Sequence, residues 1–317
     1  MKKGFIAFLI LLIVLLAPVY LFIPNHLEIR KTAYVNAVAD ATYRQVSEKT
    51  AWKRWWPRET SAGKATNASQ PEKFFYDGIS YSVTSHVLGP IQVLITTDGG
   101  EFNSTLLVVP IRSDSSALTW RCLIETGINP FEKIKYYRQS RNIATGMDKI
   151  LDRLQSFLSR QENLYNIPIS RTKVTDTILV TTRVTLNHYP STAEIYNSIN
   201  KLKQYVSSQG AKETNYPMLH VLRTDSTRFE TMIAIPVNKR IGNDAEFVHK
   251  RMVPGNILLA RVKGGHHSVQ KAFAEMETYV KDHELIPPAI PFQSLETDRL
   301  REPDTTKWIT RIYFPVL

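Results

Sequence analysis

The chain has 317 residues, of which 43% are hydrophobic and 22% are charged. These are values of a folded globular protein, so disorder is not expected, and the length allows two domains with separate cores. The formal net charge is +11, but the basic excess is spread evenly and no run of Lys and Arg alternates with aromatic residues, so no nucleic-acid partner is expected.

An uncharged apolar run opens the chain. Residues 4–23 would span roughly 30 Å as a helix, the thickness of a bilayer core. The run is long for a signal peptide and lacks a small-x-small cleavage site, so we expect an uncleaved membrane anchor, with a cleaved signal as the alternative. Lys2 and Lys3 favour a cytoplasmic N-terminus, an inner-membrane location and periplasmic domains, although Arg30 and Lys31 weaken this bias.

The next segment predicts a helix, a meander of strands and a second helix. Residues 27–35 alternate as a strand, and residues 40–50 have helical spacing with Asp40 as a possible N-cap. Trp52, Trp55 and Trp56 are interpreted as core packing, with a cavity-lining indole as the alternative. Turn residues then separate four predicted strands, and an apolar stripe predicts a long helix; these elements are 79–88, 91–97, 101–111, 117–125 and 130–160.

This order of elements resembles the START-like helix-grip superfamily, also called SRPBCC. The resemblance covers about residues 27–160 and includes the stretch Trp52-Lys53-Arg54-Trp55-Trp56-Pro57. It implies an antiparallel sheet wrapped around a long helix. Members of this superfamily typically hold an apolar ligand between helix and sheet, although many have a filled cavity.

The C-terminal half repeats one phrase. Ile233-Ala234-Ile235-Pro236-Val237 returns as Ile312-Tyr313-Phe314-Pro315-Val316. Proline cannot donate to a sheet ladder, so both copies are predicted strands that end at equivalent places. Each follows a strand, at 178–186 or 257–262, and a helix-like stretch. Residues 169–317 are therefore predicted to form a duplicated β-α-β-β domain with a cleft between its halves.

This second domain resembles the gyrase-inhibitor-like, AraC-type effector-binding family. The resemblance rests on Val253–Gly265, the helix 269–282, the pair Pro291-Phe292 and the ending Asp304–Val316. It implies a curved sheet whose concave face holds small molecules, frequently aromatic or cationic ones. The overall fold class is α+β, with an N-terminal transmembrane helix, a helix-grip domain and the duplicated domain.

The resemblance also points to ligand contacts. Where the family typically has a glutamate, this chain has Arg311, and Gln293 and Leu295 replace an acidic residue and a tyrosine. An arginine attracts anions, and loss of the base argues against hydrolysis. With a register shifted by a residue or two, Glu296 would take the acidic place. The predicted ligand-binding residues are Tyr189, Phe229, Glu230, Phe292, Arg311 and Tyr313, although Glu230 is also compatible with a solvated strand carboxylate.

Metal and nucleophile patterns are missing from the sequence. The adjacent His266 and His267 lack further ligands at metal-binding spacing, so we expect a turn there, with Ser268 as N-cap of the next helix. The single cysteine, Cys122, excludes an intramolecular disulfide and lies mid-strand, as a buried small hydrophobe would. We expect no catalytic residue, no metal and no cofactor.

The sequence thus predicts a membrane-anchored protein that binds a small apolar or amphiphilic molecule, which Arg311 allows to be anionic, without catalysis. Two alternatives stay open. A small-molecule hydrolase requires an acid or base on the concave face of the second domain. A scaffold with filled cavities requires pockets smaller than the few hundred Å³ usual for ligands.

Overall fold

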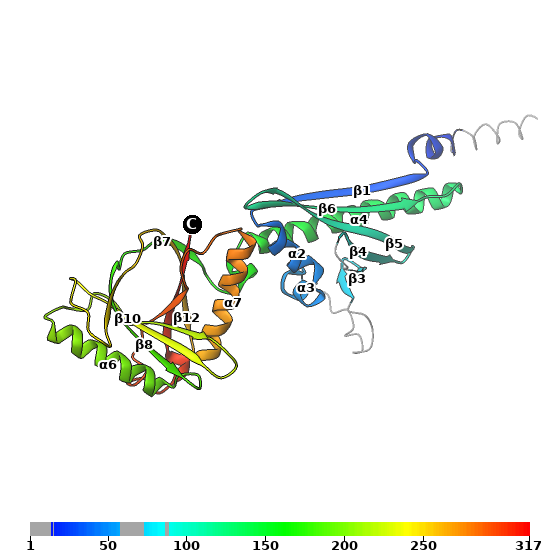
Figure 1. The fold of residues 1–317 in the computed structure, drawn as a ribbon. Helices are drawn as coiled ribbons and strands as arrows, with labels where there is room; N and C mark the ends of the chain where they lie inside the picture. The colour runs from blue at the N-terminus through cyan, green and yellow to red at the C-terminus, as the bar shows by residue number, and fades with distance from the viewer. Residues whose placement is uncertain (1–13, 15, 58–72, 86–88) are drawn as a thin grey trace, which may run out of the picture. The chain divides into compact units, whose positions relative to one another are not determined.

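A computed structural model describes residues 14, 16–57, 73–85 and 89–317. It separates into two compact units, Met1–Arg160 and Gln161–Leu317 (Figure 1). The anchor predicted at residues 4–23 lies largely outside the described residues, and of it residues 16–22 are helical. Among the residues described, no helix combines the length and the apolar character that a membrane crossing needs.

The first unit is built on a six-stranded antiparallel sheet with the order β1-β6-β5-β4-β3-β2. The long helix α4 packs on β1 and β6 (Figure 1). The predicted meander and terminal helix are confirmed, within a few residues at their ends, except that residues 86–88 of the strand predicted at 79–88 lie outside the described residues. The elements are β1 (His26–Val35), α2 (Ala39–Ser47), α3 (Lys49–Trp55), β2 (Phe74–Tyr76), β3 (Ile79–Ser85), β4 (Ile91–Thr97), β5 (Gly100–Arg112), β6 (Ser115–Glu125) and α4 (Pro130–Leu158).

Helix α4 begins where its sequence allows it to begin. The Asn129 side chain accepts a hydrogen bond from the Phe131 amide at 2.9 Å, and Pro130 occupies a first-turn position that needs no amide donor. The buried stripe runs through Ile143, Met147, Ile150, Leu151, Leu154 and Leu158. Ile134, near the start of the helix, is 41% exposed. The apolar contact with the sheet therefore begins after the first two turns.

The tryptophan cluster is core packing at two of its three positions. The indoles of Trp52 and Trp55 are buried and donate to the carbonyls of Val46 at 2.8 Å and Gln45 at 3.0 Å. Each buried N–H is thus satisfied. The prediction of one helix over 40–50 with Asp40 as N-cap is wrong: Asp40 lies in the first turn of α2, and the helical residues after Ser47 form the separate α3.

The second unit contains an eight-stranded antiparallel sheet with the order β11-β8-β10-β9-β13-β14-β12-β7. Outward from the central pair β9–β13, the strands follow in equivalent order: β10, β8 and β11 on one side, and β14, β12 and β7 on the other. This symmetry confirms the duplication predicted from the repeated phrase. The elements are α5 (Gln161–Tyr165), β7 (Ser170–Lys173), β8 (Ile178–Leu186), α6 (Thr192–Ser208), β9 (Met218–Arg223), β10 (Phe229–Pro236), β11 (Val248–Arg251), β12 (Asn256–Lys263), α7 (His266–Asp282), β13 (Phe292–Leu295), η1 (Thr305–Lys307) and β14 (Ile309–Val316).

The two faces of this sheet differ. Helix α6 packs on β8 and β10, and α7 packs on β12 and β14, on the outer side of the curled sheet (Figure 1). Ile233 and Ile235 of β10 belong to the buried cluster that contains the apolar residues of α6. Because side chains alternate along a strand, Met232 and Ala234 lie on the opposite, concave face.

The start of α7 differs from the prediction. The helix begins at His266, so both histidines lie in its first turn, and the N-cap position belongs to Gly265, with no side-chain cap. Ser268 is therefore not the N-cap. Gly264 has a φ of +129°, a backbone conformation that favours glycine, which explains why the Gly-Gly pair precedes this helix.

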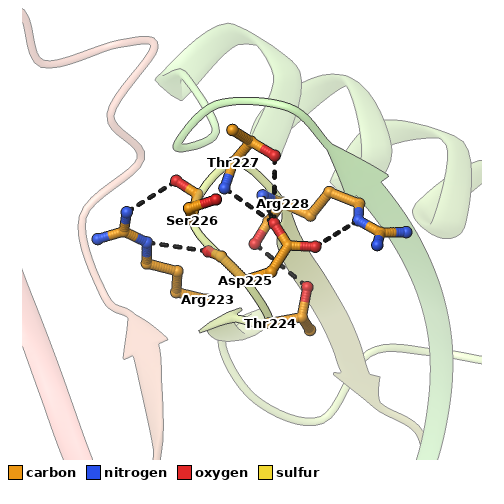
Figure 2. Close-up of polar contacts among 6 residues, drawn as sticks. All are labelled: Arg223, Thr224, Asp225, Ser226, Thr227 and Arg228. Carbon is orange, nitrogen blue, oxygen red and sulfur yellow. Dashed lines mark hydrogen bonds and ion pairs between the residues drawn. The ribbon is translucent and has the colours of Figure 1, made fainter.

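The loop between β9 and β10 is held by Asp225 (Figure 2). Its carboxylate accepts hydrogen bonds from the amides of Thr227 and Arg228, each at 2.8 Å, and from the Arg228 guanidinium at 2.6 Å. Arg223 donates to the Asp225 and Ser226 carbonyls at 3.1 and 2.7 Å. These bonds, led by the Thr227 amide, hold the pKa of Asp225 far below its ordinary value, so the carboxylate stays ionised at acidic pH values that protonate an ordinary aspartate.

Candidate ligand-binding site

A cavity of about 380 Å³ opens on the concave face of the second unit. This volume lies within the range of small-molecule sites, roughly 300–1,000 Å³. Both halves of the duplicated sheet contribute to its walls. The apolar lining includes Leu179, Met218, Met232 and Ala234 from the first half and Phe292 and Pro315 from the second.

Strand alternation accounts for this apolar lining. Leu179, Met218, Ile257 and Phe292 form one buried cluster, and Ala234 and Tyr313 pack against it. Ala234 pairs in register with Met218 on one side and Thr181 on the other. Residues opposite one another in antiparallel strands point to the same face. Strand pairing therefore gathers apolar side chains from several strands on the face where the cavity lies.

A small number of polar groups accompany the apolar walls. His220 Nδ1 lies 2.8 Å from the Pro291 carbonyl oxygen. A carbonyl only accepts, so Nδ1 donates, and Nε2 of the neutral ring is left as an acceptor. Lys250, Arg251 and Asn256 also line the cavity, and among the described lining residues none carries a carboxylate side chain.

Of the six residues predicted to bind ligand, Phe292 lines the cavity. Tyr313 lies on the same concave face, and its ring stacks on Phe292 with centroids 5.1 Å apart and planes inclined by 18°. Tyr313 therefore supports the wall behind Phe292. The other four predicted residues lie elsewhere and are not among the lining residues.

Arg311 belongs to a three-residue ion cluster. Glu296 bonds to Arg261 at 2.7 and 3.2 Å and to Arg311 Nε at 2.7 Å, and its side chain is 15% exposed. The hydrogen bond from Arg261, assisted by Arg311, holds the pKa of Glu296 below its ordinary value. The Arg311 guanidinium also lies over the Tyr216 ring, 5.3 Å from its centroid. A carboxylate held this way is a poor general base, because its lowered pKa makes it a weak proton acceptor and the two arginines occupy its lone pairs.

Glu230 shares the concave face with Met232 and forms an ion pair with Arg183, Nε to Oε1 at 3.3 Å. Phe229 lies on the helix-facing side of β10, because side chains alternate along the strand. Its ring contacts that of Tyr189 edge to face, with the ring centroids 5.9 Å apart. Tyr189 also packs on His266 at 4.5 Å. The structure therefore brings Tyr189 and Phe229 together, but on the outer side of the sheet.

Met218, His220, Met232 and Lys250 line the cavity but were missed by sequence reasoning. Alternation placed Met232 on one face of its strand without saying which face is concave. Lys250 lies on β11, a strand of four residues whose side chains are mostly exposed, so it carries no apolar pattern. The internal repeat at residues 233–237 and 312–316 was the feature of the sequence that could have located the cavity, because it marks the ends of two strands next to it.

Other reactive groups give no alternative site. No group of three metal-ligating side chains occurs among the residues the structure describes. Cys122 is buried, and burial raises the pKa of its thiol to about 11, so it stays protonated.

Comparison with known proteins gives one family match and several similar solved structures. Residues 173–317 match the family model of the GyrI-like small molecule binding domain. Similar solved structures include the EcmrR C-terminal domain, with 16% identity, coverage of 48% of this chain and 98% of that chain, and a TM-score of 0.42. SAV2435 bound to tetraphenylphosphonium has 14% identity, coverages of 48% and 94%, and a TM-score of 0.33. A hydrolase from Listeria innocua has 13% identity, coverages of 50% and 96%, and a TM-score of 0.36. None of the curated proteins compared matches the chain.

Proposed function

We propose that the second unit, whose residues 173–317 match a small-molecule-binding domain, binds a small apolar or amphiphilic molecule without transforming it. The observation that carries this proposal is the cavity of about 380 Å³ with predominantly apolar walls from both halves. Burial of apolar ligand surface against such walls is favourable by about 25 cal/mol per Å². A filled scaffold would not leave this volume open.

The charges on the concave face support binding rather than hydrolysis. Glu296 is held by two arginines and Glu230 by one. General acid–base chemistry needs a group that exchanges its proton within hydrogen-bond reach of the substrate. In the described lining, His220 carries the imidazole side chain, and its Nδ1 is occupied by the Pro291 carbonyl. A hydrolase would have to rely on this single imidazole.

The proposal retains two expectations that rest on the sequence. The apolar run at residues 4–23 would attach the protein to the inner membrane, with both units in the periplasm. The order of strands and helices in the first unit supports its helix-grip resemblance. In this arrangement the second unit would present its cavity close to a membrane.

The test uses N-phenyl-1-naphthylamine, a neutral apolar probe whose fluorescence rises on burial. Ala234 lines the cavity, so Ala234→Trp would fill much of it and lower probe affinity at least tenfold. Leu222→Trp is the matched control, because Leu222 lies on the same face, is 47% exposed and is not a lining residue. Circular dichroism checks that both variants fold. Absence of binding by the wild-type chain, or unchanged binding by Ala234→Trp, would contradict the proposal.

A further inference from the structure

The sheet of the second unit carries far more positive than negative charge. Its eight strands contain one acidic residue, Glu230, and nine basic ones: Arg171, Lys173, Arg183, Arg223, Lys250, Arg251, Arg261, Lys263 and Arg311. On the concave face, the ion pairs join Arg183 to Glu230, and Arg261 and Arg311 to Glu296. The carboxylates of this face are therefore already committed to arginines, and the face keeps a positive excess.

Lys250 brings this positive charge to the cavity. It pairs in register with Leu179, and Val248 pairs with Thr181. Since Leu179 and Thr181 line the cavity, Lys250 lies on the cavity side of β11 and is itself a lining residue. Its side chain is exposed, and the ion pairs found among the described residues do not include it.

The rim beside Lys250 is apolar as well as basic. Val253 and Ile290 both line the cavity, yet they are 80% and 49% exposed. An apolar group longer than the cavity would cover them and remove further apolar surface from water. The rim thus offers contacts to both parts of an amphiphile.

We infer that the cavity selects anionic amphiphiles: the apolar part fills the hollow and the anionic group is bound by Lys250 at the rim. This inference rests on the proposed function and adds the charge of the ligand. An ammonium and an anion attract each other, whereas a lipophilic cation would meet Lys250 and Arg251 and no carboxylate side chain among the described lining residues. Lys250, rather than Arg311, is the cation that meets the ligand.

The test compares two probes that share one skeleton. 1-Anilinonaphthalene-8-sulfonate is N-phenyl-1-naphthylamine with an added sulfonate, so the pair isolates the contribution of the anion. For an exposed ion pair, Lys250→Gln is expected to weaken sulfonate binding up to about fivefold, and the charge reversal Lys250→Glu about twentyfold. Both variants should change binding of the neutral probe less than about twofold, and 1 M salt should reduce the difference between wild type and variants.

Two further variants complete the design with the full chain. Lys250→Arg keeps the charge and should restore sulfonate affinity. Lys271→Gln removes an exposed charge on α7, away from the lining, and should change neither probe. If Lys250→Glu binds the sulfonate as tightly as wild type while Ala234→Trp loses the neutral probe, the inference is overturned and the proposed function stands. If the wild-type chain binds neither probe, the proposed function itself fails.

Discussion

Replacing Glu296 by glutamine is expected to destabilise the second unit, because it removes the anion between two cations. Arg261 and Arg311 are directly opposite one another in the β12–β14 register, so the variant leaves two like charges as cross-strand neighbours. An exposed ion pair contributes at most about 1 kcal/mol, and Glu296 makes two such pairs with its side chain only 15% exposed. With the added repulsion, we expect a loss of about 2–3 kcal/mol.

The control is Glu230→Gln. Glu230 has one arginine partner at 3.3 Å, and the side chain of that partner is 55% exposed. Its replacement should cost less than about 1 kcal/mol. Urea-dependent hydrogen exchange of peptides from β13 and β14 measures the unfolding free energy of the second unit separately from the first.

The pH dependence provides an independent check. Arginine contacts hold the pKa of Glu296 below its ordinary value of 4.5, so the carboxylate stabilises the fold above that pH, and the contribution is lost as the pH falls through the folded-state pKa. The difference between wild type and Glu296→Gln should therefore shrink below about pH 4. Equal losses in Glu296→Gln and Glu230→Gln, or a difference that stays constant with pH, would refute this reasoning.

Two further predictions concern other titratable groups. Cys122 is buried, and burial raises the pKa of its thiol to about 11. Iodoacetamide at about pH 8 should therefore leave this thiol unmodified in the folded chain and modify it in urea. Equal rates of modification under both conditions would contradict its burial. Burial, Arg299 and His267 lower the pKa of His266, so an NMR titration should give a value below 6.5, and Arg299→Met should raise it. Because the folded state favours the neutral ring, this group costs stability as the pH falls below 6.5. A midpoint at or above 6.5 would exclude this account.

The elements with clear apolar periodicity were predictable from the sequence. Turn residues between apolar runs predicted the strands of the first sheet, the apolar stripe predicted α4, and the repeated phrase predicted the duplicated second sheet. Burial on one face of an element leaves a periodic pattern in the sequence. The start of α7 was not predictable in the same way: Ser268 is a favoured N-cap residue, but the left-handed Gly264 lets the helix begin three residues earlier.

The site was harder to predict than the fold. Which face of β10 is concave depends on where α6 packs, and this is a long-range contact that Met232 and Glu230 do not encode locally. The pairing of Glu296 with Arg261 and Arg311 brings together residues up to 50 positions apart. Lys250 was missed because β11 is too short and too exposed to alternate.

The β9–β13 seam has a mechanical consequence for the cavity. The two halves share only two residue pairs in register, Gln293 with Leu219 and Ser294 with Met218, whereas the strands within a half share four or more. We expect the seam, which has fewer register pairs, to open more easily than the strand pairs within a half. We expect small rotations of the two halves about the seam to widen or narrow the cavity, which would let it bind ligands of different width.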